Sequence, residues 1–337
     1  LACDDRAELL SFHTFYQPLV FSLVLLVGMM GNGLLLAVLM KRQGRLRVTE
    51  IYLFHLALAD LLLLLTFPFM VAQVSVGWIF GAFLCKIVGL LNRLNFFCGN
   101  LLLACISFER YLAIVHAVRS LRGRRPQSVH LTCAAVWLLC LGASTPFVPF
   151  LSVGEHAADP ALSSCHFHGH GIHDSNLELA NRFLIHALCF FLPLTVMSYC
   201  YSAVVFTLCR SRHRGLEKRG AIRLALQVTV AFCLCWLPYN LTLLVDTLIM
   251  TGVLSPQGCE GLTRVKMVLV VTESIGYAHC CLIPLLYAFR GVHFRKDLQV
   301  LLPSSCCGYL DLRTLGAEST SRVSFSEAAI STSSKIM

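Results

Sequence analysis

Residues 19–40 read LVFSLVLLVGMMGNGLLLAVLM, and no charged side chain interrupts this stretch. A helix needs about 20 mostly apolar residues to cross the hydrocarbon core of a bilayer. The same length and character recur at residues 53–74, 83–106, 131–151, 183–208, 224–250 and 265–289. Only helices and closed barrels pair all their backbone groups inside a bilayer, and the short alternating segments typical of barrel strands are not seen. We therefore predict an all-α membrane protein, a bundle of seven transmembrane helices whose third helix continues to about residue 115.

The composition and the placement of charge agree with a multi-pass membrane protein. Hydrophobic residues make up 57% of the chain and charged residues 13%, about half the charged share of a soluble domain. The net charge of +9 could indicate a nucleic-acid partner, but the basic residues gather in alternate connections instead: Lys41, Arg42, Arg45 and Arg47; Arg119, Arg122, Arg124 and Arg125; Arg210, Arg212, Arg214, Lys218, Arg219 and Arg223; Arg290, Arg295 and Lys296. The positive-inside rule places these connections in the cytoplasm, with the N-terminus outside and the C-terminus inside.

Four regions follow from this topology. We expect a truncated extracellular N-terminal segment at 1–18, because the chain begins with Leu1 rather than Met, and a transmembrane domain at 19–289. Residues 290–302 are predicted to form a short amphipathic eighth helix on the lipid surface. A Ser/Thr-rich cytoplasmic tail, 303–337, follows and is predicted to be disordered. Cys306 and Cys307, directly after the eighth helix, are candidates for palmitoylation.

Four cysteines lie where the oxidising exterior can reach them, either in outer segments or, for Cys85, at the outer start of the third span: Cys3, Cys85, Cys165 and Cys259. An oxidising exterior permits disulfides, and four cysteines allow three pairings; four free thiols are the alternative. The long outer segment 152–181 carries acidic residues and several histidines. It is predicted to be a loop that either contacts a ligand or is merely solvated, and its His-x-His spacing does not predict a metal site.

Charges within the spans point to function, because a buried charge in a membrane is costly. Asp60 lies in the middle of the second span and Arg93 lies in the third, while Asp246 and Glu273 lie in the outer halves of the sixth and seventh. The last two could line a water-filled cavity that attracts a cationic partner; internal pairing between helices is the alternative. Five spans also contain a proline, which predicts kinked helices able to move: Pro68, Pro146, Pro193, Pro238 and Pro284.

Several motifs, in order and spacing, resemble those of rhodopsin-like (class A) G-protein-coupled receptors from about residue 3 to residue 302. They are Gly31-Asn32, LALAD at 56–60, Glu109-Arg110-Tyr111, Trp137, Pro193 with Tyr201, and CWLP at 235–238. Within that family the chain is similar to C-X-C chemokine receptors. This similarity is carried by TFP at 66–68, Trp78, RYLAIVHA at 110–117, and Glu273 with HCC at 279–281.

The resemblance implies the ligand and the sites that hold it. The ligand would be a small basic C-X-C chemokine, which docks on the N-terminus and outer loops and then inserts its own N-terminus into the helical cavity. The ligand-binding residues implied are Glu273, Asp246, Arg93, Tyr239 and Trp78. The outer cysteines match the two-bridge pattern of the group, Cys85–Cys165 and Cys3–Cys259.

The resemblance also implies a route of activation. Trp236 would pass ligand contact to the kink at Pro238, and the sixth helix would swing outward. Arg110, released from Glu109, would then meet an inhibitory heterotrimeric G protein, and cell migration would follow. The switch set also includes Tyr201, Tyr287 and Ile283, and the coupling set is Glu109, Arg110 and Tyr111. Receptor kinases and arrestin would act on the tail.

Three departures from the family pattern change these expectations. Glu109 replaces the usual Asp but keeps the carboxylate, while Ile283 replaces an Asn and Gly99 replaces a hydroxyl-bearing residue near Asp60. The family holds a regulatory sodium ion beside this aspartate, here with Asn95 as a further candidate ligand. We therefore expect weakened sodium regulation and altered basal signalling, and no other cofactor.

Other classes of membrane protein fit less well. No internal repeat suggests an ion-coupled transporter, and the seventh span holds no Lys for a retinal Schiff base. An enzyme is not expected, because Asp60 and Glu273 are too far apart along the membrane normal to act as a dyad and no catalytic spacing is present. A scavenging chemokine receptor without G-protein signalling, or another peptide-binding class A receptor, stays open as an alternative.

Overall fold

The computed structural model describes residues 6–42, 46–116, 126–155, 162–167, 173–210, 216–255 and 258–290. Seven helical spans within these residues are long and apolar enough to cross a membrane, which confirms the predicted seven-helix bundle: Thr14–Lys41, Val48–Val76, Gly81–Val115, Gln127–Phe150, Glu178–Thr207, Thr229–Met250 and Glu260–Leu286. The predicted eighth helix, the tail, and Cys306 and Cys307 lie outside the described residues.

The first half of the bundle consists of α1 (Arg6–Lys41), α2 (Val48–Leu64), α3 (Phe67–Val76), α4 (Gly81–Val115) and α6 (Pro126–Ser144). The second span is broken between α2 and α3, where Pro68 opens the new helix and Thr66 donates to the Leu63 carbonyl at 2.6 Å. At the end of the fourth span, α6 tightens into the 3₁₀ helix η1 (Thr145–Phe150), which begins next to Pro146. Proline causes both changes because it lacks the N–H that an α-helix requires.

The second half consists of α7 (His173–Leu184), the π-helical η2 (Ile185–Phe191), α8 (Leu192–Arg210), α9 (Leu216–Met250), α10 (Gly258–Tyr277) and α11 (His279–Arg290). The π turn directly precedes Pro193, whose missing N–H disrupts the ladder of hydrogen bonds. Ala278 separates α10 from α11. Pro238 and Pro284 instead lie inside α9 and α11, which continue past them.

The structure corrects the prediction that residues 152–181 form a loop. Strands β1 (Leu151–Glu155) and β2 (Ser163–Phe167) make an antiparallel hairpin in which Val153 faces Cys165. α7 then begins at His173, ten residues before the predicted start of the fifth span. Its sequence, HDSNLELANRFL, is too polar to be recognised as membrane-spanning. Helices α1 and α9 also begin before the predicted spans, because hydropathy marks only the part of a helix that contacts lipid tails.

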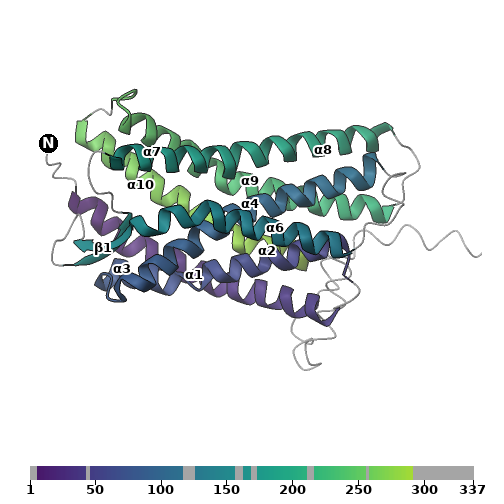
Figure 1. The fold of residues 1–337 in the computed structure, drawn as a ribbon, viewed down its shortest axis with the longest axis horizontal. Helices are drawn as coiled ribbons and strands as arrows, with labels where there is room; N and C mark the ends of the chain where they lie inside the picture. The colour runs from purple at the N-terminus through teal and green to yellow at the C-terminus, as the bar shows by residue number, and fades with distance from the viewer. Residues whose placement is uncertain are drawn as a thin grey trace, which may run out of the picture. The chain divides into compact units, whose positions relative to one another are not determined.

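α4 occupies the centre of the bundle and packs against α2, α6 and α8, while α1 packs against α2 and α11, and α9 against α10. Figure 1 shows these helices running alongside one another, with β1 and α3 at one end. Leu56, Leu63 and Leu102 in the interior are fully buried, whereas Phe83 and Leu131 on the helix surfaces are 76% and 72% exposed. Large exposed hydrophobic side chains of this kind are expected where the surrounding solvent is lipid.

We refer below to the hairpin end, which carries β1 and β2, and to the Arg110 end. Cys85 and Arg110 lie near the two ends of α4, about 37 Å apart along the helix axis.

Candidate functional site

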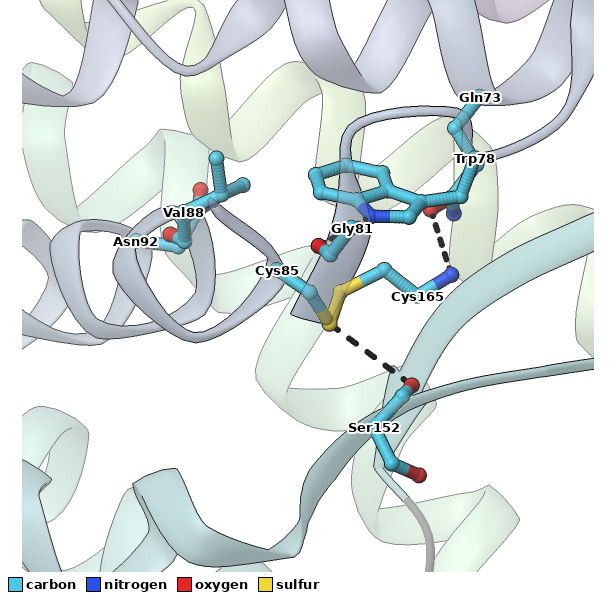
Figure 2. Close-up of a disulfide and its surroundings, with 8 residues drawn as sticks. All are labelled: Gln73, Trp78, Gly81, Cys85, Val88, Asn92, Ser152 and Cys165. Carbon is cyan, nitrogen blue, oxygen red and sulfur yellow. Dashed lines mark hydrogen bonds between the residues drawn. A yellow bond between two sulfur atoms is a disulfide. The ribbon is translucent and has the colours of Figure 1, made fainter. Parts of the chain in front are cut away.

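A disulfide fastens the hairpin to the bundle. Cys85 of α4 is bonded to Cys165 of β2, with their Cα atoms 5.6 Å apart, which confirms this predicted pair. The Cys165 backbone N–H donates to Gln73 Oε1 of α3 at 2.9 Å, as Figure 2 shows. The hairpin is therefore tied to two helices. The side chain of Cys259 and all of Cys3 lie outside the described residues, so the second pair stays a prediction.

Trp78 supports this end of the bundle from within. The indole is only 4% exposed, packs with Cys85 and Val88, and donates from Nε1 to the Gly81 carbonyl at 2.9 Å. Figure 2 places the ring beside the disulfide. The glycines on either side, Gly77 and Gly81, have φ values of 79° and 77°, which other residues rarely adopt. The structure places Trp78 as a buried support for the hairpin. Its predicted contact with ligand stays a prediction.

A small cavity of about 120 Å³ lies between the helices below the hairpin end. It is lined by Asn92, Arg93, Phe96, Phe97, Ile185, Trp236, Tyr239, Glu273 and Tyr277. The structure thus brings together Arg93, Tyr239 and Glu273, as the sequence predicted. Glu273 accepts a hydrogen bond from Tyr277 Oη at 3.1 Å.

Arg93 is oriented by two neighbours that sequence reasoning did not identify. Its Nη1 donates to Asn181 Oδ1 at 2.6 Å, and its guanidinium lies 4.5 Å from the centre of the Phe147 ring. Asn181 is present because α7 extends the fifth span outward. A cation and a carboxylate therefore line one small cavity, so the site offers a partner for either sign of charge.

For Asp246 the structure shows the alternative that the sequence left open, internal pairing between helices. Asp246 is 3% exposed and accepts from Arg182 of α7 at 2.7 Å and from Lys266 of α10 at 2.8 Å. Arg182 also pairs with Glu178 at 2.9 Å. Asp246 is thus a member of an ion cluster that joins α7, α9 and α10, and it is absent from the lining of the cavity described above. The sequence did not identify Arg182 as a partner, because this residue lies in the polar part of α7 that precedes the predicted fifth span.

Trp236 forms one wall of the cavity and is 2% exposed. Aromatic rings surround it, with centroid separations of 4.5 Å to Phe96, 5.8 Å to Tyr277 and 5.4 Å to the His279 imidazole. Gly276 of α10 also lies against the indole, and a Cβ at that position would meet ring atoms at 2.7 Å. Any change of the Trp236 rotamer must therefore move these neighbours.

Asp60 lies in the interior and is completely buried. Asn95 Nδ2 donates to Asp60 Oδ1 at 3.0 Å, and His279 Nε2 lies 3.4 Å from the same oxygen. Ile283, 2% exposed, contributes hydrocarbon where the family has an amide. Around this carboxylate Asn95 presents its N–H, and His279 and Cys280 offer nitrogen and sulfur. Hard cations require several oxygen ligands, so these residues fit a sodium ion poorly.

At the other end of the bundle, Arg110 Nη2 donates a short hydrogen bond to Thr49 Oγ1 of α2. Tyr201 and Thr229 share a hydrogen bond of 3.2 Å between α8 and α9. Tyr111 contacts His116, with 3.1 Å between Oη and Nε2. Thr49 and Thr229 were not identified from sequence, because a lone threonine in a span carries no recognisable signal. The side chain of Tyr287 lies outside the described residues.

Comparison with known proteins identifies the family. The pattern of the 7-transmembrane receptors of the rhodopsin family matches residues 31–287. C-X-C chemokine receptor type 5 of Rattus norvegicus is 42% identical over 304 residues, which cover 90% of this chain and 81% of the relative. The Homo sapiens type 5 receptor is 41% identical over 297 residues, covering 88% and 79%. C-X-C chemokine receptor type 3 of Homo sapiens is 44% identical over 297 residues, covering 87% and 77%.

From the sequence, three stretches predicted a resemblance to type 5: VGW at 76–78, LLLACI at 101–106 and GYAHCCL at 276–282. Overall identity does not separate type 5 from type 3, because both groups match at nearly the same level. The motifs, the seven helices and these relatives agree. The chain belongs to the rhodopsin family of seven-transmembrane receptors and, within it, to the C-X-C chemokine receptors.

Proposed function

We propose that this chain is a plasma-membrane receptor that binds a basic C-X-C chemokine at its hairpin end, which faces outward. On binding it activates an inhibitory heterotrimeric G protein at its Arg110 end, and so directs cell migration. The observation that carries the proposal is the cavity that Arg93, Tyr239 and Glu273 line together with Trp236. Chemokine binding outside and signalling inside are connected through this residue.

The cavity of about 120 Å³ is small, so a ligand segment can enter only if neighbouring side chains move. Glu273 is the group available to a cationic ligand N-terminus. An exposed ion pair contributes about 0–1 kcal/mol, and a pair in this partly dry cavity contributes more unless desolvation offsets it. At the rim, basic ligand side chains compete with Lys266 for Asp246, because Lys266 is 41% exposed and can turn to solvent.

Activation is a shift between two packings of the helices. We assign the present structure to the resting packing, because Arg110 is held by Thr49 of α2 within the bundle. Ligand pressure on Trp236 would be passed to Pro238, two residues further along α9. Outward movement of α9 would then break the Tyr201–Thr229 contact and release Arg110 toward the G protein. Tyr287 and Ile283 on α11 complete the switch.

The partners at the tail follow from the same interpretation. Receptor kinases would phosphorylate its Ser and Thr residues, and arrestin would bind the phosphorylated tail. Palmitoylation of Cys306 and Cys307, with the amphipathic eighth helix, would hold this region on the lipid surface. No enzymatic activity and no nucleic-acid partner are proposed.

The test is a screen of purified chemokines on cells that express the chain, with inhibition of cyclic AMP and recruitment of arrestin measured separately. We expect one or more basic C-X-C chemokines to elicit both responses. Arg110→Ala should abolish the cyclic AMP response while chemokine binding persists, because Arg110 lies at the opposite end of α4 from the binding site.

One observation supports a second candidate function. Ile283 occupies a position where the family has an asparagine, and this change could uncouple ligand binding from G-protein activation in a scavenging receptor. Arrestin recruitment without any cyclic AMP response would favour the scavenger. A response to an unrelated peptide but to no chemokine would refute both candidates.

A further inference from the structure

Three different ligand atoms converge in the interior beside Trp236. They come from Asp60 of α2 and from His279 and Cys280 at the start of α11, all three fully buried or nearly so. An Asp60 carboxylate oxygen, a His279 ring nitrogen and the Cys280 Sγ all lie within 4.8 Å of one another. Carboxylate, imidazole and thiolate together are the ligands typical of a zinc site.

Two of the three separations between these atoms match a shared metal ion, and the third is no more than 4.8 Å. His279 Nε2 lies 3.4 Å from Asp60 Oδ1 and 3.6 Å from Cys280 Sγ. Tetrahedral zinc has bonds of about 2.0–2.2 Å to nitrogen and oxygen and about 2.3 Å to sulfur, which places neighbouring ligand atoms about 3.3–3.7 Å apart. The spacing therefore requires little movement of the side chains to bind an ion.

The orientation of His279 is fixed by a hydrogen bond on its other side. Nδ1 lies 2.7 Å from the Gly276 carbonyl oxygen, which can only accept, so Nδ1 carries a hydrogen. Nε2 is thereby the nitrogen that faces Asp60 and Cys280. Metal-binding histidines almost always donate their second ring N–H to a carbonyl or carboxylate in this way.

The carboxylate gives a second, independent indication of a cation site. Asp60 is completely buried, and among the described residues no group makes a hydrogen bond to its Oδ2. A buried carboxylate oxygen without a partner is costly. Native proteins rarely keep such an atom without a hydrogen-bond donor, a water or an ion beside it.

We propose that Asp60, His279 and Cys280 form an intramembrane site for a borderline divalent transition metal, with Zn²⁺ as its representative. The site takes the place of the family's sodium site, which the oxygen-poor surroundings and Ile283 disfavour. On binding, the Cys280 thiol proton and any proton on His279 Nε2 leave to water. Carboxylate and thiolate then balance the charge of the ion, and a water completes the coordination.

The site would tie α2 to α11 next to Trp236. The His279 ring that would hold the metal lies 5.4 Å from the indole centroid. A bound ion would therefore resist movement of both Trp236 and α11, and would stabilise the resting packing.

The experiment uses the full chain, purified in detergent without a histidine tag and depleted of metal. ZnCl₂ is titrated against it, and the melting temperature and the zinc retained per receptor are measured, with NaCl as a parallel titration. Cys280→Ser removes the thiolate with little change in size. Cys281→Ser is the matched control, because its sulfur faces the Val24 carbonyl of α1 at 3.6 Å.

We expect the wild type and Cys281→Ser to retain one zinc and to melt at higher temperature with zinc but not with sodium. Cys280→Ser should bind zinc at least ~10-fold more weakly, since changes even outside the ligand shell cost ~10–100-fold. Should that variant fold poorly, Co²⁺ added to the wild type must show the absorption of a thiolate–cobalt bond. If Cys280→Ser retains as much zinc as the wild type, the proposal is overturned, because the histidines of the outer segment would then account for the bound metal. A wild type that retains no zinc, or a cobalt complex without thiolate absorption, would also overturn it.

Discussion

Replacing Gly276 by alanine places a methyl group against the central tryptophan of the receptor. A Cβ at this position would lie 2.7 Å from Trp236 Cζ3 and 2.8 Å from Cε3. Carbon atoms do not approach this closely, so either the indole or α10 must shift. We propose that Trp236 passes ligand contact from the cavity toward the Arg110 end. The substitution tests this role without removing any polar contact.

The expected size of the effect follows from the packing. The indole cannot retreat freely, since Phe96 and His279 flank it at centroid separations of 4.5 Å and 5.4 Å. Overpacking a well-packed core costs about 1–3 kcal/mol. If this cost falls on the resting packing alone, the ratio of active to resting receptor rises about 5- to 150-fold. Gly276→Ala should therefore raise basal signalling.

The assay is ligand-free inhibition of cyclic AMP at matched surface expression, together with the melting temperature of the purified receptor. Gly142→Ala is the matched control, because a Cβ there would meet nothing within 4 Å. A second substitution, Trp236→Phe, removes the outer ring of the indole and should relieve the strain of Gly276→Ala in the double variant. Basal signalling equal to that of Gly142→Ala would refute the reasoning. A lower melting temperature with unchanged basal signalling would also refute it, because both packings would then hold Trp236 alike.

Three further predictions concern charged and polar groups. Glu273→Gln should lower agonist potency while surface expression stays normal, because the cavity carboxylate is lost and the shape is kept; normal potency would contradict a ligand contact. Asp246→Asn should lower the free energy of unfolding by about 2 kcal/mol, less than the ~3–5 kcal/mol of a fully buried pair, because Lys266 is 41% exposed and Arg182 keeps Glu178. Thermal denaturation measures this loss, and an unchanged melting temperature would show that the ion cluster contributes nothing to stability. Agonist binding should respond weakly to sodium, and Ile283→Asn should strengthen that response; a strong sodium effect that the substitution leaves unchanged would contradict the sodium prediction.

The seven spans could be predicted because each depends on a strong local signal, whereas one disulfide could be predicted from the family resemblance. Hydrocarbon admits only helices and closed barrels, and a stretch as long and as continuously apolar as residues 19–40 fits only a helix. The Cys85–Cys165 pair was implied by the resemblance to chemokine receptors, and the structure confirms it. The prolines predicted kinked helices. Pro68 coincides with a break between two helices and Pro146 with a tightened turn, whereas Pro238 lies inside one continuous helix. The continuity of α9 through Pro238 depends on packing that the sequence does not display.

The parts that were not predicted depend on polar segments near the membrane surface. α7 extends the fifth span by residues that are helical but not apolar, and this extension supplies both Asn181 for Arg93 and Arg182 for Asp246. Hydropathy cannot detect such a segment, so Asp246 was assigned to the cavity when it belongs to an ion cluster. The hairpin was not predicted either, because two five-residue strands give only a weak signal in the sequence. A disulfide and a hydrogen bond to Gln73 fix it in the structure.

Ile283 and His279 both affect how the charge of Asp60 can be compensated. A fully buried carboxylate must be compensated, and the loss of an amide at residue 283 and of a hydroxyl at Gly99 removes oxygen atoms that a sodium ion would use. Three compensations fit the contacts seen: a proton on Asp60, a second proton on His279 Nε2 at 3.4 Å, or a metal shared with Cys280. All three make agonist binding insensitive to sodium, so that measurement alone cannot distinguish them. Only the metal requires the Cys280 thiolate, and for this reason the comparison of Cys280→Ser with Cys281→Ser shows whether the receptor uses the metal or a proton.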